Sequence, residues 1–202
     1  MTDSESVTVV VPAYNEAETI GDVVSGLSGI VDEVVVVDDG SDDATAEIAR
    51  NEGATVITRR QNRGYDRTLS EGFAYAARSG TDIVVTFDAD GQHSPDDIPR
   101  VVAPIRRGTA SIVVGRRPNP ARVGERLFAE YAKYRFGIDD PLSGFKAYDV
   151  GTYEEVGYFD RCSSIGTQLM VAAAKRGYNI DQIDISISER ADEPRFGHWR
   201  AN

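Results

Sequence analysis

One segment, residues 81–95, constrains the fold of this chain more than any other, because an apolar run changes there directly into polar residues. The sequence of residues 83–87 is IVVTF, in which every side chain is β-branched or aromatic. Such a run is typical of a strand that is covered on both faces inside a parallel sheet. The segment therefore predicts a buried strand that ends at Asp88, and open α/β sheets bind their ligands beyond the carboxyl ends of their strands.

Asp88, Asp90 and Gln92 follow this strand at alternate positions. If the chain stays extended, their side chains share one side and offer hard oxygen ligands that suit Mg²⁺ or Mn²⁺. Ions of this kind usually keep several waters and bridge to the phosphates of a substrate. A D-x-D pattern alone is common, so the alternative interpretation is a polar turn with solvated acids.

Length and composition limit the class of protein. The 202 residues are enough for one substantial core and contain no interdomain linker, so we expect a single domain over residues 1–202. The net charge of −11 argues against general nucleic-acid binding. The single cysteine, Cys162, permits no internal disulfide and suits a reducing cytosol. We expect no transmembrane helix and no signal peptide, because no apolar run approaches ~18 residues and the N-terminus is acidic.

Strand-like and helix-like segments alternate along the chain. Strands are predicted at residues 7–11, 34–37, 54–58, 83–87 and 111–114, and a helix follows each of the first four, the second of these helices over residues 42–50. This alternation with short loops is typical of a doubly wound parallel sheet. Further helices are predicted at residues 124–136 and 163–177, and a last strand at 180–188.

Polar residues also follow the first two strands. Asn15 and Glu18 have the spacing of a capping box, which predicts a helix N-terminus there, and such an end favours an anionic ligand. A capped helix start is nevertheless more often structural. Asp38 and Asp39 close the second strand, where a carboxylate commonly accepts hydrogen bonds from a ribose or base.

Positive charge gathers in residues 106–135, although the chain as a whole is acidic. This stretch has eight bases and two acids, a net charge of +6. On its predicted helix, Leu127, Tyr131 and Tyr134 form a stripe with Phe128 beside it, flanked by Arg and Lys, which is typical of a helix at a membrane interface. The alternative is a solvated basic face over ordinary core aromatics.

Six motifs occur in an order and spacing that resemble the family 2 glycosyltransferases, close to the branch of dolichyl-phosphate mannose synthase and the polyprenyl-phosphate glycosyltransferases. Their joint occurrence over nearly the whole chain is far more specific than any one of them. The motifs are P-x-Y-N-E at residues 12–16, D-D-G-S-x-D-x-T at 38–45, N-x-G-Y at 62–65, D-x-D-G-Q-H-x-P at 88–95, G-[SR]-R at 115–117 and D-P-x-S-G-F-K at 140–146.

This resemblance implies a GT-A type nucleotide-sugar-binding fold, an α/β fold with a mostly parallel central sheet flanked by helices. It also implies a nucleotide-sugar donor and a divalent metal, Mg²⁺ or Mn²⁺, near Asp88, Asp90 and Gln92. The donor contacts that it implies are Pro12, Ala13, Tyr14, Glu16, Val37, Asp39 and Ala89.

Two parts of the family pattern are altered in this chain. Gln168 stands where the family often carries Glu, and we retain it as a substrate-side candidate. The closing R-x-x-G-x-S-K pattern is only partly kept, so Arg190 and Arg195 compete as candidates for a diphosphate contact.

We therefore expect a metal-dependent transfer of a hexose from a donor of the GDP-mannose or UDP-glucose type to a polyprenyl phosphate. The enzyme is expected to lie peripherally at the cytoplasmic face of the cell membrane, with a membrane-protein partner. Since an acceptor phosphate is already an anion, the reaction needs positioning and charge screening more than a base. Arg116, Arg117 and Arg126 suit a phosphate clamp through their fork-shaped donors.

Two other functions stay open at this stage. Transfer to a hydroxyl group of a glycan would need a catalytic base, for which Asp140 is the candidate. A nucleotide-sugar-binding protein without turnover is the alternative outside the enzymes.

Overall fold

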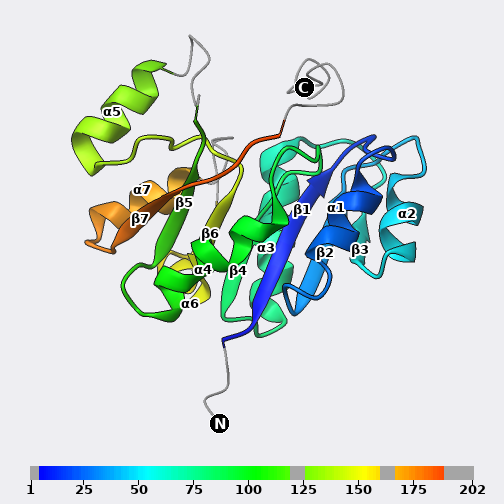
Figure 1. The fold of residues 1–202 in the computed structure, drawn as a ribbon, viewed down its shortest axis with the longest axis horizontal. Helices are drawn as coiled ribbons and strands as arrows, with labels where there is room; N and C mark the ends of the chain where they lie inside the picture. The colour runs from blue at the N-terminus through cyan, green and yellow to red at the C-terminus, as the bar shows by residue number, and fades with distance from the viewer. Residues whose placement is uncertain (1–4, 119–125, 160–166, 189–202) are drawn as a thin grey trace.

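The structure is a computed structural model that describes residues 5–118, 126–159 and 167–188 (Figure 1). Its strands are β1 (Val7–Ala13), β2 (Glu33–Asp38), β3 (Thr55–Thr58), β4 (Ile83–Thr86), β5 (Ile112–Arg116), β6 (Lys146–Asp149) and β7 (Ile180–Asp184). Its helices are α1 (Ile20–Leu27), α2 (Thr45–Asn51), α3 (Tyr65–Arg78), the 3₁₀ turn η1 (Pro95–Asp97), α4 (Ile98–Arg106), α5 (Arg126–Phe136), α6 (Val150–Val156) and α7 (Thr167–Lys175). In the described parts of the chain, no helix is long and apolar enough to cross a membrane.

The described strands form one sheet in the order β3-β2-β1-β4-β6-β5-β7. All neighbouring pairs are parallel except the two that involve β6, which runs antiparallel to β4 and to β5. The mostly parallel sheet is thus confirmed, but β5 does not lie next to β4 as a purely parallel doubly wound order requires. The later strand β6 lies between them.

Helices cover both faces of the sheet, and alternate side chains of each strand enter one of two cores. Val9 and Val11 of β1 pack with apolar residues of α1, α2 and α4. Val10 between them packs with the opposite layer, to which α3, α6 and α7 contribute. Figure 1 shows α1 and α4 in front of the sheet and α3 behind it. Burial on both faces explains why the strands read as continuous apolar runs rather than as alternating ones.

Two helix starts differ from the predicted ones. Asn15 does not cap α1: it has a left-handed backbone, with φ at 55°, and its Oδ1 accepts a hydrogen bond from the N–H of Asp42. Its side chain thus joins two loops, and α1 begins later, after Thr19. The second helix begins at Thr45 instead of residue 42, because Asp43 accepts hydrogen bonds from the N–H and hydroxyl of Thr45.

Asp39 directly follows β2 and connects it to the segment before α3. Its fully buried carboxylate accepts hydrogen bonds from the N–H groups of Arg63 and Gly64, at 3.0 and 2.8 Å, and from Arg59 Nη1 at 3.0 Å. These contacts fix the start of α3 against the end of β2. The carboxylate therefore has a structural role, because it connects β2 to the start of α3. Its contact with a nucleotide stays a prediction.

We predict that Asp39→Ala lowers the free energy of unfolding by about 3 kcal/mol, because it removes the buried carboxylate that pairs with Arg59 and accepts hydrogen bonds from the N–H groups of Arg63 and Gly64. Urea unfolding followed by circular dichroism measures the loss. Asp42→Ala is the matched control, since it removes an exposed acid from the same loop and should change stability by less than about 0.5 kcal/mol. Equal stability of the two variants would contradict the role of Asp39 in connecting β2 to the start of α3.

Candidate active site

Asp88 lies just beyond β4 and is held by two side chains. Its Oδ1 accepts a hydrogen bond from the hydroxyl of Tyr65, the first residue of α3, at 2.5 Å. Its Oδ2 lies 3.3 Å from Nε2 of His93. Burial alone would raise the pKa of Asp88, but the contacts with His93 and Tyr65 and the charge of Arg117 outweigh it, so this pKa is lowered. Asp88 is therefore an ionised carboxylate at the carboxyl edge of the sheet.

The turn that leads into β6 passes directly over this carboxylate. A Cβ atom on Gly144 would lie 2.2 Å from Oδ2 of Asp88, so this position has no space for a side chain. The hydroxyl of Thr86 donates a hydrogen bond to the carbonyl of Gly144 at 2.7 Å and fixes the turn to β4. The glycine of the D-P-x-S-G-F-K motif thus has a steric reason, which the sequence alone does not reveal.

Asp90 and Gln92 lie on the loop beyond Asp88, and both are partly exposed. Oδ1 of Asp90 accepts a hydrogen bond from the N–H of Gln92 at 3.1 Å. The charges of Asp88 and Asp90 both contribute, after burial, to the raised pKa of Tyr65, so both carboxylates lie within electrostatic reach of this hydroxyl. In the described residues no group of three or more His, Cys, Asp or Glu is arranged to hold a metal. Two carboxylates and an amide oxygen nevertheless suit Mg²⁺ or Mn²⁺ when a bound diphosphate supplies further oxygens.

Arg117 follows β5, and its side chain is held by Asp140, the first residue of the D-P-x-S-G-F-K motif. Its Nε and Nη2 donate to the two carboxylate oxygens of Asp140, at 2.8 and 2.9 Å, and its own N–H donates to the same carboxylate. Asp140 is buried, whereas the side chain of Arg117 is 29% exposed. Because both oxygens of Asp140 are occupied by Arg117, this geometry favours a role in positioning Arg117 over the role of a catalytic base.

Arg116 is in a different environment. Its guanidinium donates to Asp184 at 2.5 Å and to Asp139 at 2.8 Å, and Lys133 of α5 contacts the second oxygen of Asp139 at 2.9 Å. Two carboxylates therefore already compensate its charge. This arrangement connects α5 to the end of β5 and makes Arg116 less suited to a phosphate than the sequence predicts.

Lys146 is a buried residue of this region that the sequence analysis did not select. Its Nζ donates to the carbonyl of Ser143 at 2.5 Å, within the turn that covers Asp88. Burial lowers its pKa to about 8, although the charge of Asp140 acts in the opposite direction. A lysine among the apolar residues of the FKAY sequence was the available signal.

The remaining predicted residues divide into two groups. The end of β1, with Pro12 and Ala13, lies between the ends of β2 and β4, so these segments meet at one edge of the sheet. The residues of this edge that the resemblance implies as donor contacts are Pro12, Ala13, Tyr14, Glu16, Val37, Asp39 and Ala89. Arg190, Arg195 and the side chain of Arg126 lie outside the described parts of the structure.

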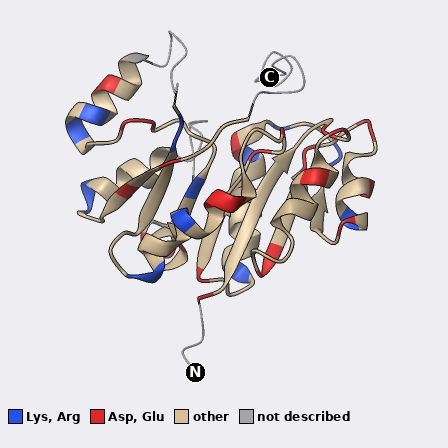
Figure 2. Cartoon of the chain, viewed as in Figure 1, with Lys and Arg blue, Asp and Glu red and all other residues tan. Residues whose placement is uncertain are grey.

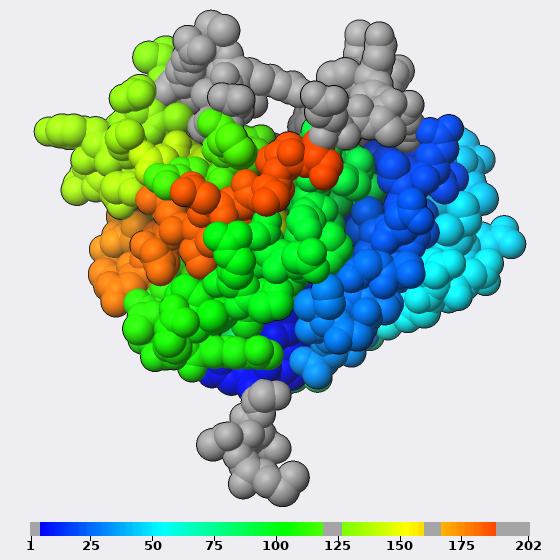
Figure 3. All heavy atoms as spheres, viewed as in Figure 1, coloured from blue at the N-terminus to red at the C-terminus, as the bar shows by residue number. Residues whose placement is uncertain are grey.

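The helix α5 presents its apolar stripe to the outside. Leu127 and Tyr134 are 86% and 91% exposed, and Tyr131 and Phe128 are exposed as well. The interpretation of these residues as ordinary core aromatics is therefore wrong for this structure. In Figure 3 the helix stands out from the body, and in Figure 2 basic residues lie on α5 and at the neighbouring end of β5.

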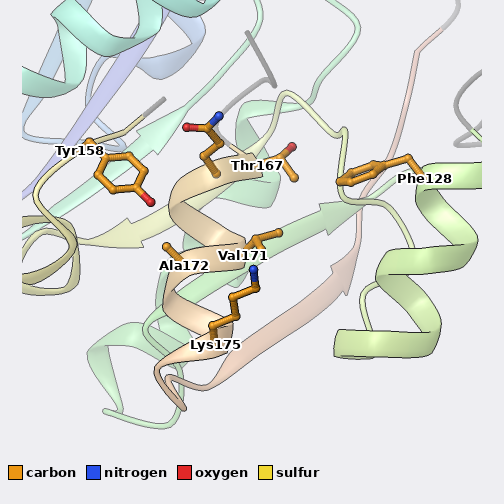
Figure 4. Close-up of a pocket in the computed structure, with 7 residues that line it drawn as sticks. Phe128, Tyr158, Thr167, Val171, Ala172 and Lys175 are labelled. Atoms are coloured by element: carbon orange, nitrogen blue, oxygen red, sulfur yellow. The ribbon is translucent and has the colours of Figure 1, made fainter. Parts of the chain in front are cut away.

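A pocket of about 350 Å³ separates α5 from α7 (Figure 4). Its lining is mostly apolar and aromatic, with a few polar groups. The lining residues are Phe128, Tyr158, Thr167, Gln168, Val171, Ala172 and Lys175. Thr167 donates a hydrogen bond to the carbonyl of Pro141, so the pocket begins next to Asp140. Gln168, the residue after Thr167, also lines this pocket.

Two known proteins with similar sequences are named as sugar transferases of dolichyl phosphate. A dolichyl-phosphate hexose transferase of Haloferax volcanii is 32% identical over 95% of this chain and 87% of its own length. A UDP-N-acetylglucosamine–dolichyl-phosphate N-acetylglucosaminyltransferase of Methanococcus voltae is 30% identical over 88% of this chain and 83% of its own length.

A solved structure with the same fold is glucosyl-3-phosphoglycerate synthase from Mycobacterium tuberculosis, in complex with Mn²⁺, uridine-diphosphate-glucose and glycerol 3-phosphate. It superposes with a TM-score of 0.79 at 26% identity, over 96% of this chain and 75% of the synthase. This likeness confirms the GT-A type fold. Residues 8–159 match the family model described as glycosyl transferase family 2. The chain therefore belongs to glycosyl transferase family 2 and is an enzyme that uses a nucleotide sugar.

Proposed function

We propose that this enzyme transfers a hexose from a nucleoside diphosphate sugar to a polyprenyl phosphate at the cytoplasmic face of the membrane. The observation that carries the proposal is the exposed apolar stripe of α5, near the partly exposed Arg117 at the sheet edge and a mostly apolar pocket. The names of the two sequence relatives support a lipid phosphate as acceptor.

On this proposal, Asp88, Asp90 and Gln92 hold a divalent ion on the donor side. Such an ion offsets the negative charge that develops on the diphosphate leaving group. The chain itself contributes a fixed orientation, because Asp88 is already held by Tyr65 and His93 before any ligand binds. Preorganised groups of this kind need little rearrangement when the charge develops.

Arg117 is the residue that we assign to the acceptor phosphate. Its partly exposed guanidinium is oriented by Asp140, and its charge lowers the pKa of Asp88, so the two residues lie within electrostatic reach of each other. An acceptor phosphate beside Arg117 would therefore lie close to the donor. Because this acceptor is an anion, the reaction needs no general base, in agreement with the occupied carboxylate of Asp140.

We assign the exposed apolar stripe of α5 to contact with the membrane surface. Leu and Tyr side chains on a helix that also carries Lys133 and Arg135 can bury apolar area among lipids while the bases contact anionic headgroups. The acidic remainder of the protein repels the anionic headgroups, but this repulsion is screened beyond about 8 Å at physiological ionic strength. The local charge near α5 then determines the contact, despite the net charge of −11.

For the metal site, we predict that Asp90→Asn lowers turnover at least about a hundredfold, because it removes a charged oxygen from the donor side. Transfer of radiolabelled hexose to polyprenyl phosphate, measured over a series of Mn²⁺ concentrations, tests this. Asp96→Asn changes an exposed acid six residues away and should leave turnover unchanged. Full activity of Asp90→Asn, or of the wild type in excess chelator, would refute the metal assignment.

For the membrane surface, we predict that the double substitution Leu127→Ser and Tyr134→Ser weakens vesicle binding at least about tenfold, since each buried apolar side chain is worth roughly 1.5–3 kcal/mol. Co-sedimentation with vesicles that contain an anionic phospholipid measures the affinity. Ile30→Ser is the control, because Ile30 is an exposed apolar residue far from α5 in the chain. Unchanged vesicle binding of the double variant, with normal transfer to polyprenyl phosphate, would show that α5 does not serve the membrane.

A further inference from the structure

Three groups hold the side chain of Asp88, and two of them come from distant parts of the chain. Tyr65, 23 residues earlier, donates to Oδ1, and Nε2 of His93 contacts Oδ2. The backbone of Gly144 closes a third side, where even a Cβ atom would collide with the carboxylate. The side chain of Asp88 is still 26% exposed, so the carboxylate faces the open edge of the sheet as well as these partners.

Tyr65 is itself rigidly placed. It is the first residue of α3, and the preceding Gly64 has a φ of 95°, a conformation that favours glycine. The N–H of Gly64 donates to the buried carboxylate of Asp39 at 2.8 Å. A continuous series of contacts therefore runs from the end of β2 through the start of α3 to the carboxylate beyond β4.

The carboxylate of aspartate turns easily about its last torsion, which is broad and roughly two-fold. Each of its oxygens has two acceptor positions, so a hydrogen bond from Tyr65 uses one position and leaves another for a ligand. We propose that Tyr65 is a positioning residue that fixes the carboxylate of Asp88 in the orientation that a divalent ion requires. This inference rests on the metal site of the proposed function and assigns a role that the D-x-D motif does not include.

The test is Tyr65→Phe, which removes one hydroxyl and keeps the aromatic ring. Hydrogen bonds to metal-binding carboxylates typically contribute 10–100-fold to metal affinity. We expect the affinity for Mn²⁺, measured by electron paramagnetic resonance with the metal alone and with uridine diphosphate, to fall by about tenfold or more. Turnover of the variant should recover as the Mn²⁺ concentration rises, which a general loss of structure would not allow.

Tyr75→Phe is the matched control, because Tyr75 lies on the same helix and its hydroxyl also donates to a carboxylate, that of Glu33 at 3.3 Å. Glu33 begins β2, at the opposite edge of the sheet. The control should bind Mn²⁺ like the wild type.

Three outcomes would overturn the inference, and the last of them also refutes the metal assignment. If Tyr65→Phe binds Mn²⁺ as tightly as the wild type, or if both variants lose affinity equally, Tyr65 does not position Asp88 for the metal. If the wild type itself binds no Mn²⁺, the metal assignment of the proposed function fails, and the role of Tyr65 fails with it.

Discussion

The insertion of β6 between β4 and β5 is the constraint on which the site depends. Because β6 runs antiparallel to both neighbours, its amino end lies at the same sheet edge as their carboxyl ends. The turn that precedes Lys146 is thereby placed between Asp88 and Arg117. A purely parallel sheet would put β4 and β5 side by side and leave no place for this turn, so the reversed strand β6 puts the turn between the acidic motif after β4 and the basic motif after β5.

Charge at this edge is compensated in separate local groups. Asp140 pairs with Arg117 and Asp139 with Arg116, so the arginines on the proposed acceptor side are held in fixed orientations. On the proposed donor side, Asp88 accepts a hydrogen bond from Tyr65 and contacts His93, and the charge of Arg117 also lowers its pKa. These interactions keep the carboxylate ionised, which is the state in which it can bind a divalent ion.

The sequence predicts those features that depend on residues close together in the chain. The IVVTF run and the valines of β1 and β2 indicate buried strands because local apolarity decides burial, and the D-x-D and G-[SR]-R motifs mark the ends of β4 and β5. Contacts between distant segments were not predictable. Three such contacts are the hydrogen bond between Tyr65 and Asp88, the close approach of Gly144 to Asp88, and the hydrogen bond from Gly64 to Asp39. All three depend on the strand order, which the periodicity of apolar residues does not encode.

The strand order also separates the two substrates of the proposed reaction. The segments assigned to the donor follow β1, β2 and β4, which are neighbours, whereas Arg117 follows β5 and α5 comes after it. Within the described residues, the turn before β6 lies between these halves, so on the proposed reaction the two substrates would meet beside Gly144. Any side chain at this position would collide with the carboxylate of Asp88. Packing against Asp88 therefore requires glycine there, at the point where the proposed donor and acceptor halves adjoin.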